Sequence, residues 1–223
     1  MTAPLVCIAL LGAAGCRQPA RAAEEAVLAP AATIAAEETE GLKTAIFAGG
    51  CFWGVEGVFS HVMGVTSAVS GYHGGTKADA NYRRVSAGRT AHAEAVRMIY
   101  DPSVVRYDEL LRIFFSVVAD PTLKNRQGPD VGTQYRAALI PVGAEQKRVA
   151  AAYLAQIRKS GVWGRPIVTG IEAYSTFYPA ETDHQDFMAE NPRHPYILRW
   201  DAPKVRALSR LYPGHYRKAF RRG

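Results

Sequence analysis

A single cysteine in the body of the chain carries the clearest chemical signal. The stretch AGGCFWG, residues 48–54, places Cys51 after two glycines and directly before Phe52 and Trp53. Glycines let the backbone turn tightly and approach a ligand closely. A cysteine that only fills a core needs no glycine pair before it, so these surroundings favour a reactive thiol over a packing residue.

The residues around Cys51 predict a strand–turn–helix junction. Residues 43–48 (KTAIFA) form a short apolar run that stops at the glycines, and residues 52–60 carry apolar side chains at helical spacing. Cys51 would then stand at a helix N-terminus, where free N–H groups and the helix dipole favour a thiolate. We therefore expect a lowered pKa for the Cys51 thiol, beside an apolar pocket for a small alkyl group formed by Phe52 and Trp53.

Glu94 is the second candidate for chemistry. Residues 91–100 (AHAEAVRMIY) alternate as a strand, with His92 and Glu94 on the face that continues into Val96 and Met98. A carboxyl on an apolar face has a raised pKa, which a general acid requires. The alternative is a glutamate at a strand edge, paired with an arginine.

Other polar residues have both a functional and a structural interpretation. Tyr82 and Tyr135 could donate hydroxyl hydrogen bonds to a ligand or serve as core residues. Asp130, in a glycine-containing loop, could bind a water or cap a turn. His184, in ETDHQ, hints at a metal-ligand set, although a hydrogen-bonded helix histidine is the better interpretation.

The elements that must position these residues alternate along the chain. Beyond those already given, we expect strands over 65–72, 134–142 and 167–173, and helices over 107–118, 144–159 and 180–190. Strands interleaved with packing helices predict an α+β fold, a two-layer α/β sandwich with helices on a mixed sheet.

Composition predicts one globular domain. The chain has 223 residues, 48% of them hydrophobic and 21% charged, and a formal net charge of +7. The basic residues gather after residue 199, but no groove-reading motif accompanies them, so we expect a solvated tail and no nucleic-acid partner.

The cysteine count narrows the class of protein further. The chain has three cysteines, Cys7, Cys16 and Cys51, of which only Cys51 lies in the globular part. One thiol excludes a disulfide scaffold and a multi-cysteine zinc site.

The first residues predict export. The apolar run over residues 5–14 is too short to span a membrane and precedes small residues, as in a secretory signal peptide over residues 1–22. Two processing routes compete, cleavage after residues 20–22 (ARA) or lipidation of Cys16, which would tether the protein to the envelope. A disordered leader on a cytoplasmic protein is the alternative. Residues 23–42 are rich in Ala, Glu and Pro and predict a flexible acidic linker.

Five stretches, in order, resemble motifs of the A-type peptide methionine sulfoxide reductases. They are GGCFWG, GYHGG, YRRVSAGRTAHAEAV with YDP, DPTLKNRQGPDVGTQYRAA and FYPAETDHQDF, and they cover about residues 43–195. The resemblance assigns residues 43–200 to the reductase domain and leaves 201–223 as a basic C-terminal tail.

The resemblance implies reduction of the S epimer of methionine sulfoxide, free or in proteins, for protein repair. It implies a ferredoxin-like plait and no metal or organic cofactor. Cys51 would attack the sulfoxide sulfur and become a sulfenic acid, with Glu94 as proton donor. The remaining roles fall on Tyr82 and Tyr135, which would hold the oxygen, on Asp130 in the same network, and on Phe52 and Trp53, which would receive the substrate methyl.

The chain departs from the family pattern at its C-terminal end. Many members carry resolving cysteines there, whereas none follows Cys51 here. We expect a monomer whose sulfenic acid is reduced by an external thiol, from a thioredoxin-like protein, a glutaredoxin system or a small thiol. Cys16 could resolve it only if neither cleaved away nor acylated. Ala119 replaces the usual histidine before DPT, which indicates a local packing change.

Two other functions compete with this hypothesis. A cysteine hydrolase would use Cys51 and His92 with a carboxylate, and it needs the histidine within hydrogen-bond reach of the sulfur. A binding module for oxidised or methionine-rich peptides would keep the pocket without turnover.

Overall fold

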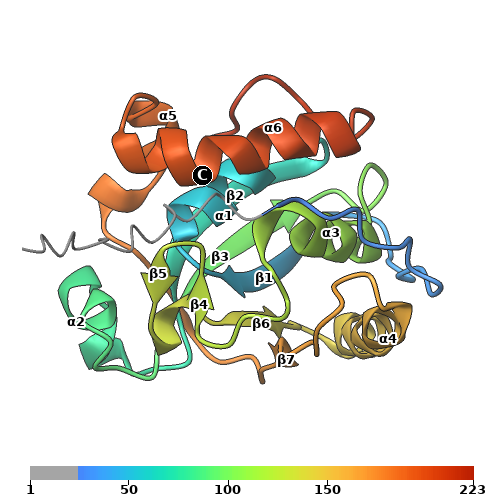
Figure 1. Cartoon of the computed structure of the whole chain (residues 1–223), viewed down its shortest axis with the longest axis horizontal. Coiled ribbons are helices and arrows are strands. Elements are labelled where there is room, and N and C mark those ends of the chain that lie inside the picture. The colour runs from blue at the N-terminus through green and yellow to red at the C-terminus, as the bar shows by residue number, and fades with distance from the viewer. Residues whose placement is uncertain (1–24) are drawn as a thin grey trace, which may run out of the picture.

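A computed structural model describes residues 25–223 (Figure 1). The predicted signal peptide and Cys16 lie outside these residues. Six strands form one sheet, in which every pair of neighbours is antiparallel except β6 and β7. In spatial order the strands are β7 (Gly170–Ile171), β6 (Ala137–Ile140), β1 (Lys43–Gly49), β3 (Ala93–Tyr100), β2 (Val65–His73) and β8 (Phe177–Pro179).

Helices and a small two-stranded ladder complete the fold. The ladder pairs β4 (Arg126–Gln127) with β5 (Asp130–Val131). The α-helices are α1 (Phe52–Ser60), α2 (Tyr82–Ser86), α3 (Tyr107–Ile113), α4 (Ala144–Ser160), α5 (Phe187–Glu190) and α6 (Ala202–Leu211). Short 3₁₀ turns span Lys77–Asp79, Thr133–Tyr135 and Thr182–His184, and π-helical turns span Phe114–Val118 and Ile197–Asp201.

The main core lies between the sheet and the helices. Helix α1 connects β1 to the parallel β2, and α3 connects β3 to the parallel β6, so each follows the strand–helix–strand pattern. Phe47 on β1 packs on Phe59, Tyr107 and Phe114, with ring centroids 5.1–5.8 Å apart. Figure 1 shows α6, in red, running close to α1, with α4 near β7. The predicted α+β class with a mixed sheet is confirmed, and the ferredoxin-like plait stays a prediction.

Element predictions succeed where the apolar period is long. The strand at 43–48, the helices at 52–60 and 144–159, and the strand at 65–72 are confirmed to within one residue at each end. The predicted strand at 167–173 is only the two-residue β7, and the stretch 180–190 divides into a 3₁₀ turn and α5. These short elements are held by neighbours distant in the sequence rather than by local preference.

The prediction of a flexible linker is wrong for residues 25–42. This segment has no regular structure, yet it lies against the domain, with Ala29 and Ala36 buried. The backbone N–H of Ala29 donates to Ser116 Oγ (2.9 Å), and that of Ala36 donates to Asp108 Oδ1 (2.9 Å). Alanines have small side chains, which lets the backbone come close enough for side chains of the domain to satisfy it.

The prediction of a solvated basic tail is wrong for its first half. Residues 202–211 form α6, whose Leu208 is fully buried, and the following Tyr212 is buried as well. Beyond it, the backbone N–H of Arg217 donates to the His61 carbonyl (2.9 Å). Over residues 25–223, no helix has the length and apolar character needed to cross a membrane.

Candidate active site

Strand β1 and helix α1 place Cys51 between them, as the sequence predicts. β1 ends at Gly49, Gly50 makes the turn, and Cys51 is the N-cap residue of α1. Gly50 has φ +90°, and a Cβ built on it would lie 2.6 Å from the Cβ of Gln127. A left-handed conformation and this close approach both require glycine. The glycine before Cys51 therefore sets the turn that aims the cysteine.

The Cys51 thiol has a raised pKa, so the expectation of a lowered one is wrong. Burial is the largest cause, followed by the carboxyls of Glu94, Asp201 and Asp130, all of which disfavour a thiolate. The backbone N–H of Trp53, at the start of α1, acts in the opposite direction. The helix terminus thus helps as predicted, but burial and three carboxyls outweigh it.

Glu94 lies beneath the first turn of α1, in agreement with the predicted strand face. Its side chain is buried, and Oε2 accepts a hydrogen bond from the Phe52 backbone N–H (2.9 Å). Burial raises the pKa of Glu94 to about 8, although the Phe52 N–H opposes this shift and the nearby Asp130 and Asp201 reinforce it. The carboxyl is therefore protonated near neutrality, as a general acid must be.

Tyr82 and Tyr135 reach the site from two short helical turns. Burial raises the pKa of both phenols, to about 12 for Tyr82, and Glu94 and Cys51 contribute to both shifts, which places all four groups in one site. Glu181 fixes the first turn of α2 by accepting from the Tyr82 backbone N–H (2.8 Å). Within residues 25–223, no hydrogen bond joins either phenol oxygen to another group, so both hydroxyls can donate to a ligand oxygen.

Phe52 and Trp53 belong to an aromatic cluster. Phe52 is fully buried and packs on Tyr82 (6.3 Å between ring centroids) and His184 (5.5 Å). Trp53 is partly exposed and stacks on Phe187 at 3.7 Å with an angle of 8°. Of the two rings predicted to receive the substrate methyl, Trp53 is therefore the one with an exposed surface, whereas Phe52 is part of the core.

Asp130 approaches Cys51 from the small ladder. It lies on β5 and accepts a hydrogen bond from the Tyr196 hydroxyl. Burial raises its pKa, whereas the Tyr196 hydrogen bond and the Lys204 ammonium oppose the shift. Its partner is a side chain 66 residues away rather than a local turn. Asp130 therefore belongs to the site, not to a capping motif.

Sequence reasoning missed Asp201 and Tyr196. Both contribute to the electrostatic surroundings of the site, and Tyr196 stands edge-on to Trp53 (5.9 Å). The only local signal at Asp201 is the sequence Asp-Ala-Pro, which is typical of a helix start. Nothing in the sequence indicates that it meets a cysteine 150 positions earlier.

His92 and His184 are both held by hydrogen bonds within residues 25–223. The His92 ring is held by the Gly75 N–H at Nδ1 (3.1 Å) and by the Thr76 carbonyl at Nε2 (2.9 Å), which leaves no ring nitrogen for Cys51. This geometry disfavours the cysteine hydrolase. His184 is buried and accepts from Trp53 Nε1 (3.3 Å), the hydrogen-bonded role that we favoured. Residues 25–223 contain no cluster of three or more His, Cys, Asp or Glu suited to a metal ion.

The site defines a class of protein: a thiol enzyme whose partly buried cysteine is surrounded by carboxyl and phenol groups. A family model described as peptide methionine sulfoxide reductase matches residues 43–213. This match covers most of the chain, which therefore belongs to the peptide methionine sulfoxide reductase family. It is an oxidoreductase of the A type, and thiol-dependent reduction of methionine sulfoxide is the reaction of that class.

Relatives and solved structures agree with this assignment. The chain is 55% identical over 176 residues to peptide methionine sulfoxide reductase MsrA 2 of Mesorhizobium japonicum, covering 79% of this chain and 90% of that protein. It is 52% identical over 172 residues to peptide methionine sulfoxide reductase MsrA 2 of Synechocystis, covering 77% of this chain and 80% of that protein. Reduced Mxr1 of Saccharomyces cerevisiae superposes with a TM-score of 0.58 at 32% identity, covering 73% and 92%. Methionine sulfoxide reductase A of Corynebacterium diphtheriae superposes with a TM-score of 0.58 at 29% identity. The superposition covers 78% of this chain and 88% of that chain.

Proposed function

We propose that the chain reduces the S epimer of methionine sulfoxide, in proteins and free, through a sulfenic acid on Cys51. The observation that carries the proposal is the convergence of one thiol, one protonated buried carboxyl and two phenols without partners. A sulfoxide oxygen is a poor leaving group until it is protonated, so these are the groups that its reduction needs.

Each group has a definite step in this reaction. Glu94 protonates the sulfoxide oxygen, and Tyr82 and Tyr135 hold that oxygen by donating hydrogen bonds. The Cys51 sulfur attacks the substrate sulfur while the thiol proton passes to the Glu94 carboxylate. Hydroxyl transfer to Cys51 then releases methionine, so the thiol and the sulfoxide become a sulfenic acid and a thioether, and Glu94 is again protonated.

Regeneration requires a thiol from outside the domain, because residues 25–223 contain Cys51 as their only cysteine. A first thiol forms a mixed disulfide with Cys51 and releases water, and a second thiol frees the enzyme. A thioredoxin-like protein, a glutaredoxin system or a small thiol meets this need. The binding-module alternative is less well supported, because the groups for turnover are all present.

Trapping the intermediate tests this function. The protein is mixed with a peptide carrying S-methionine sulfoxide, without thiol, and the products are measured by mass spectrometry. We expect one methionine per enzyme and a dimedone adduct on Cys51. Cys51→Ser should form neither product. Peptide that binds tightly but stays oxidised would instead support the binding module.

We also propose that the protein is exported and acts as a monomer on oxidised proteins of the cell envelope. The support is the apolar run at residues 5–14 with two processing signals after it. Cell fractionation combined with mass spectrometry of the mature N-terminus tests export. A lipidated Cys16 would show that the exported protein is tethered to the membrane, and cleavage after residue 22 would show that it is released. An intact N-terminus on protein found in the cytoplasm would contradict the proposal.

A further inference from the structure

Asp201 is a buried carboxyl that the reaction described above does not use. Its side chain is 1% exposed, and Oδ2 has no hydrogen-bond partner within residues 25–223. It sits against the first turn of α1, because a Cβ built on Gly54 would lie 2.2 Å from Asp201 Oδ1. A buried oxygen without a partner is costly, so its retention next to a reactive cysteine calls for a functional reason.

Asp201 and Cys51 line the same small cavity. Asp130, Tyr196 and Lys204 are among its other lining residues, and its volume is about 10 Å³. That volume is close to the minimum that holds one water molecule. Glu94, Tyr82 and Tyr135 do not line it. Of the groups that act on the thiol, Asp201 and Asp130 therefore line this cavity with it, whereas Glu94 and the phenols do not.

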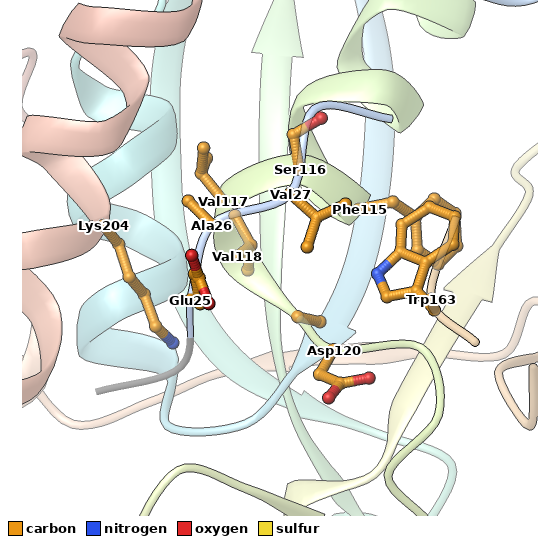
Figure 2. A pocket seen from close by; sticks show the side chains of 11 residues that line it. Glu25, Ala26, Val27, Phe115, Ser116, Val117, Val118, Asp120, Trp163 and Lys204 are labelled. Atoms are coloured by element: carbon orange, nitrogen blue, oxygen red, sulfur yellow. The ribbon is translucent and has the colours of Figure 1, made fainter. Parts of the chain in front are cut away.

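The groups that face Asp201 come from several elements. Burial raises the pKa of Asp201 to about 7, Lys204 of α6 opposes the shift and Asp130 of β5 reinforces it. Cys51, Glu94 and Tyr196 also interact electrostatically with Asp201. Figure 2 shows Lys204 beside Glu25, in a second cavity of about 50 Å³ where the N-terminal segment meets residues 115–120. That second cavity contains no thiol. The cavity that Asp201 shares with Cys51 is therefore the candidate for a further role in the reaction.

We propose that Asp201 is the proton donor of the regeneration step, which rests on the sulfenic acid of the proposed function. The thiolate of the external reductant attacks the Cys51 sulfur, an S–S bond forms and the S–O bond breaks. The Asp201 carboxyl gives its proton to the departing hydroxyl, which leaves as water. The reductant sulfur is oxidised, the Cys51 sulfur is reduced, and solvent then reprotonates Asp201.

The other carboxyls at Cys51 are less suited to this step. Glu94 Oε2 accepts from the Phe52 N–H and Glu94 does not line the cavity, and Asp130 Oδ2 accepts from the Tyr196 hydroxyl. Asp201 alone of the three has a buried oxygen without a partner in the part of the chain that is described. The cavity that it shares with Cys51 also matches the size of the water that the step releases.

Separate measurement of the two half-reactions tests the proposal. Methionine formed in a single turnover without thiol reports the first half, and loss of the sulfenic acid after dithiothreitol is added reports the second. Asp201→Asn should slow the second about 100-fold, far more than it slows the first. Glu94→Gln should slow the first. Equal slowing of both halves by Asp201→Asn, or an unchanged second half, would overturn the proposal.

The pH profile separates proton donation from a merely structural role. At equal thiolate concentration, the wild-type regeneration rate should fall as pH rises through about 7, and Asp201→Asn should lose this decline. Lys204→Gln should move the decline to higher pH, because the ammonium holds the Asp201 pKa down. Arg206→Gln, an exposed charge on the same helix, should change nothing. A decline that persists in Asp201→Asn would refute the assignment. If the wild type forms no methionine at all, the proposed function itself fails, independently of Asp201.

Discussion

At the scale of single residues, the neighbouring Cys51 and Glu94 that we propose for catalysis were predictable from local sequence, but their electrostatics were not. Strand alternation placed Glu94 on an apolar face and thereby predicted its raised pKa. The helix start at Cys51 predicted a lowered pKa for the thiol, but Asp130 and Asp201 reach it from positions 79 and 150 residues later in the chain. Such charges depend on the fold and leave no local pattern.

Glu94→Gln tests the proton donor. The amide keeps the shape of the side chain but has no acid proton, so methionine formation in a single turnover should fall about 100-fold. In the wild type, the rate should decline as pH rises through about 8, where Glu94 loses its proton, and the variant should lack this limb. Quenched-flow measurement of methionine across pH 6–9 checks both. A variant with the wild-type rate would remove Glu94 from the chemistry.

At the scale of elements, the spacing of apolar residues predicted the strands and helices that carry Cys51 and Glu94. It did not lead us to predict α6, which packs on α1 from the C-terminal end of the chain. Helix α1 and strands β1 and β3 follow from their own spacing. Helix α6 was predicted as part of a solvated tail because its sequence is basic, although Val205, Leu208 and Leu211 recur at helical spacing. Its position is set by contact with α1, where Gly54 admits the Asp201 side chain.

Gly54→Ala tests that contact. The added methyl would overlap Asp201 Oδ1, so the Asp201 side chain, or α6 with it, must shift away from α1. We expect a loss of about 1–3 kcal/mol in the free energy of unfolding, the usual cost of overpacking, together with slower regeneration. Chemical denaturation measures the free energy of unfolding. Gly214→Ala is the matched control, because a Cβ there meets no atom within 4 Å, and an equal loss in both variants would refute the contact.

Truncation tests the N-terminal segment. A chain that starts at residue 43 loses the buried Ala29 and Ala36 and the backbone hydrogen bonds to Ser116 and Asp108. We expect its Tm to lie several degrees below that of a chain starting at residue 25, as measured by calorimetry. Equal Tm values would mean that residues 25–42 contribute nothing to stability.

At the scale of the whole molecule, several buried acids make stability depend on pH. Glu56 and Glu94 both have a pKa of about 8 because of burial, and that of Asp201 is about 7. A raised native pKa means that the unfolded chain gives up the proton first, so stability is full below about pH 4.5 and is lost as pH rises through the native value. His61 and His73 have lowered pKa values, which act only below about pH 6.5.

Stability should therefore fall between pH 6.5 and 8.5, where the titration of these acids outweighs that of His61 and His73. We expect a loss on the order of 3 kcal/mol in the free energy of unfolding, measured by denaturant titration. Glu56→Gln should remove about half of the slope, whereas Glu40→Gln, at an exposed position, should keep it. A free energy of unfolding that rises over this range would contradict the burial of these carboxyls.

Stereospecific turnover tests the central claim most directly. The protein is incubated with peptides carrying either the S or the R epimer of methionine sulfoxide, with dithiothreitol as reductant, and methionine is counted per enzyme. We predict many turnovers of the S epimer, none of the R epimer and none with Cys51→Ser, because one thiol in the domain plus an external reductant completes the cycle. Turnover that survives in Cys51→Ser, or a folded wild-type protein that never forms methionine from the S epimer, would contradict the account.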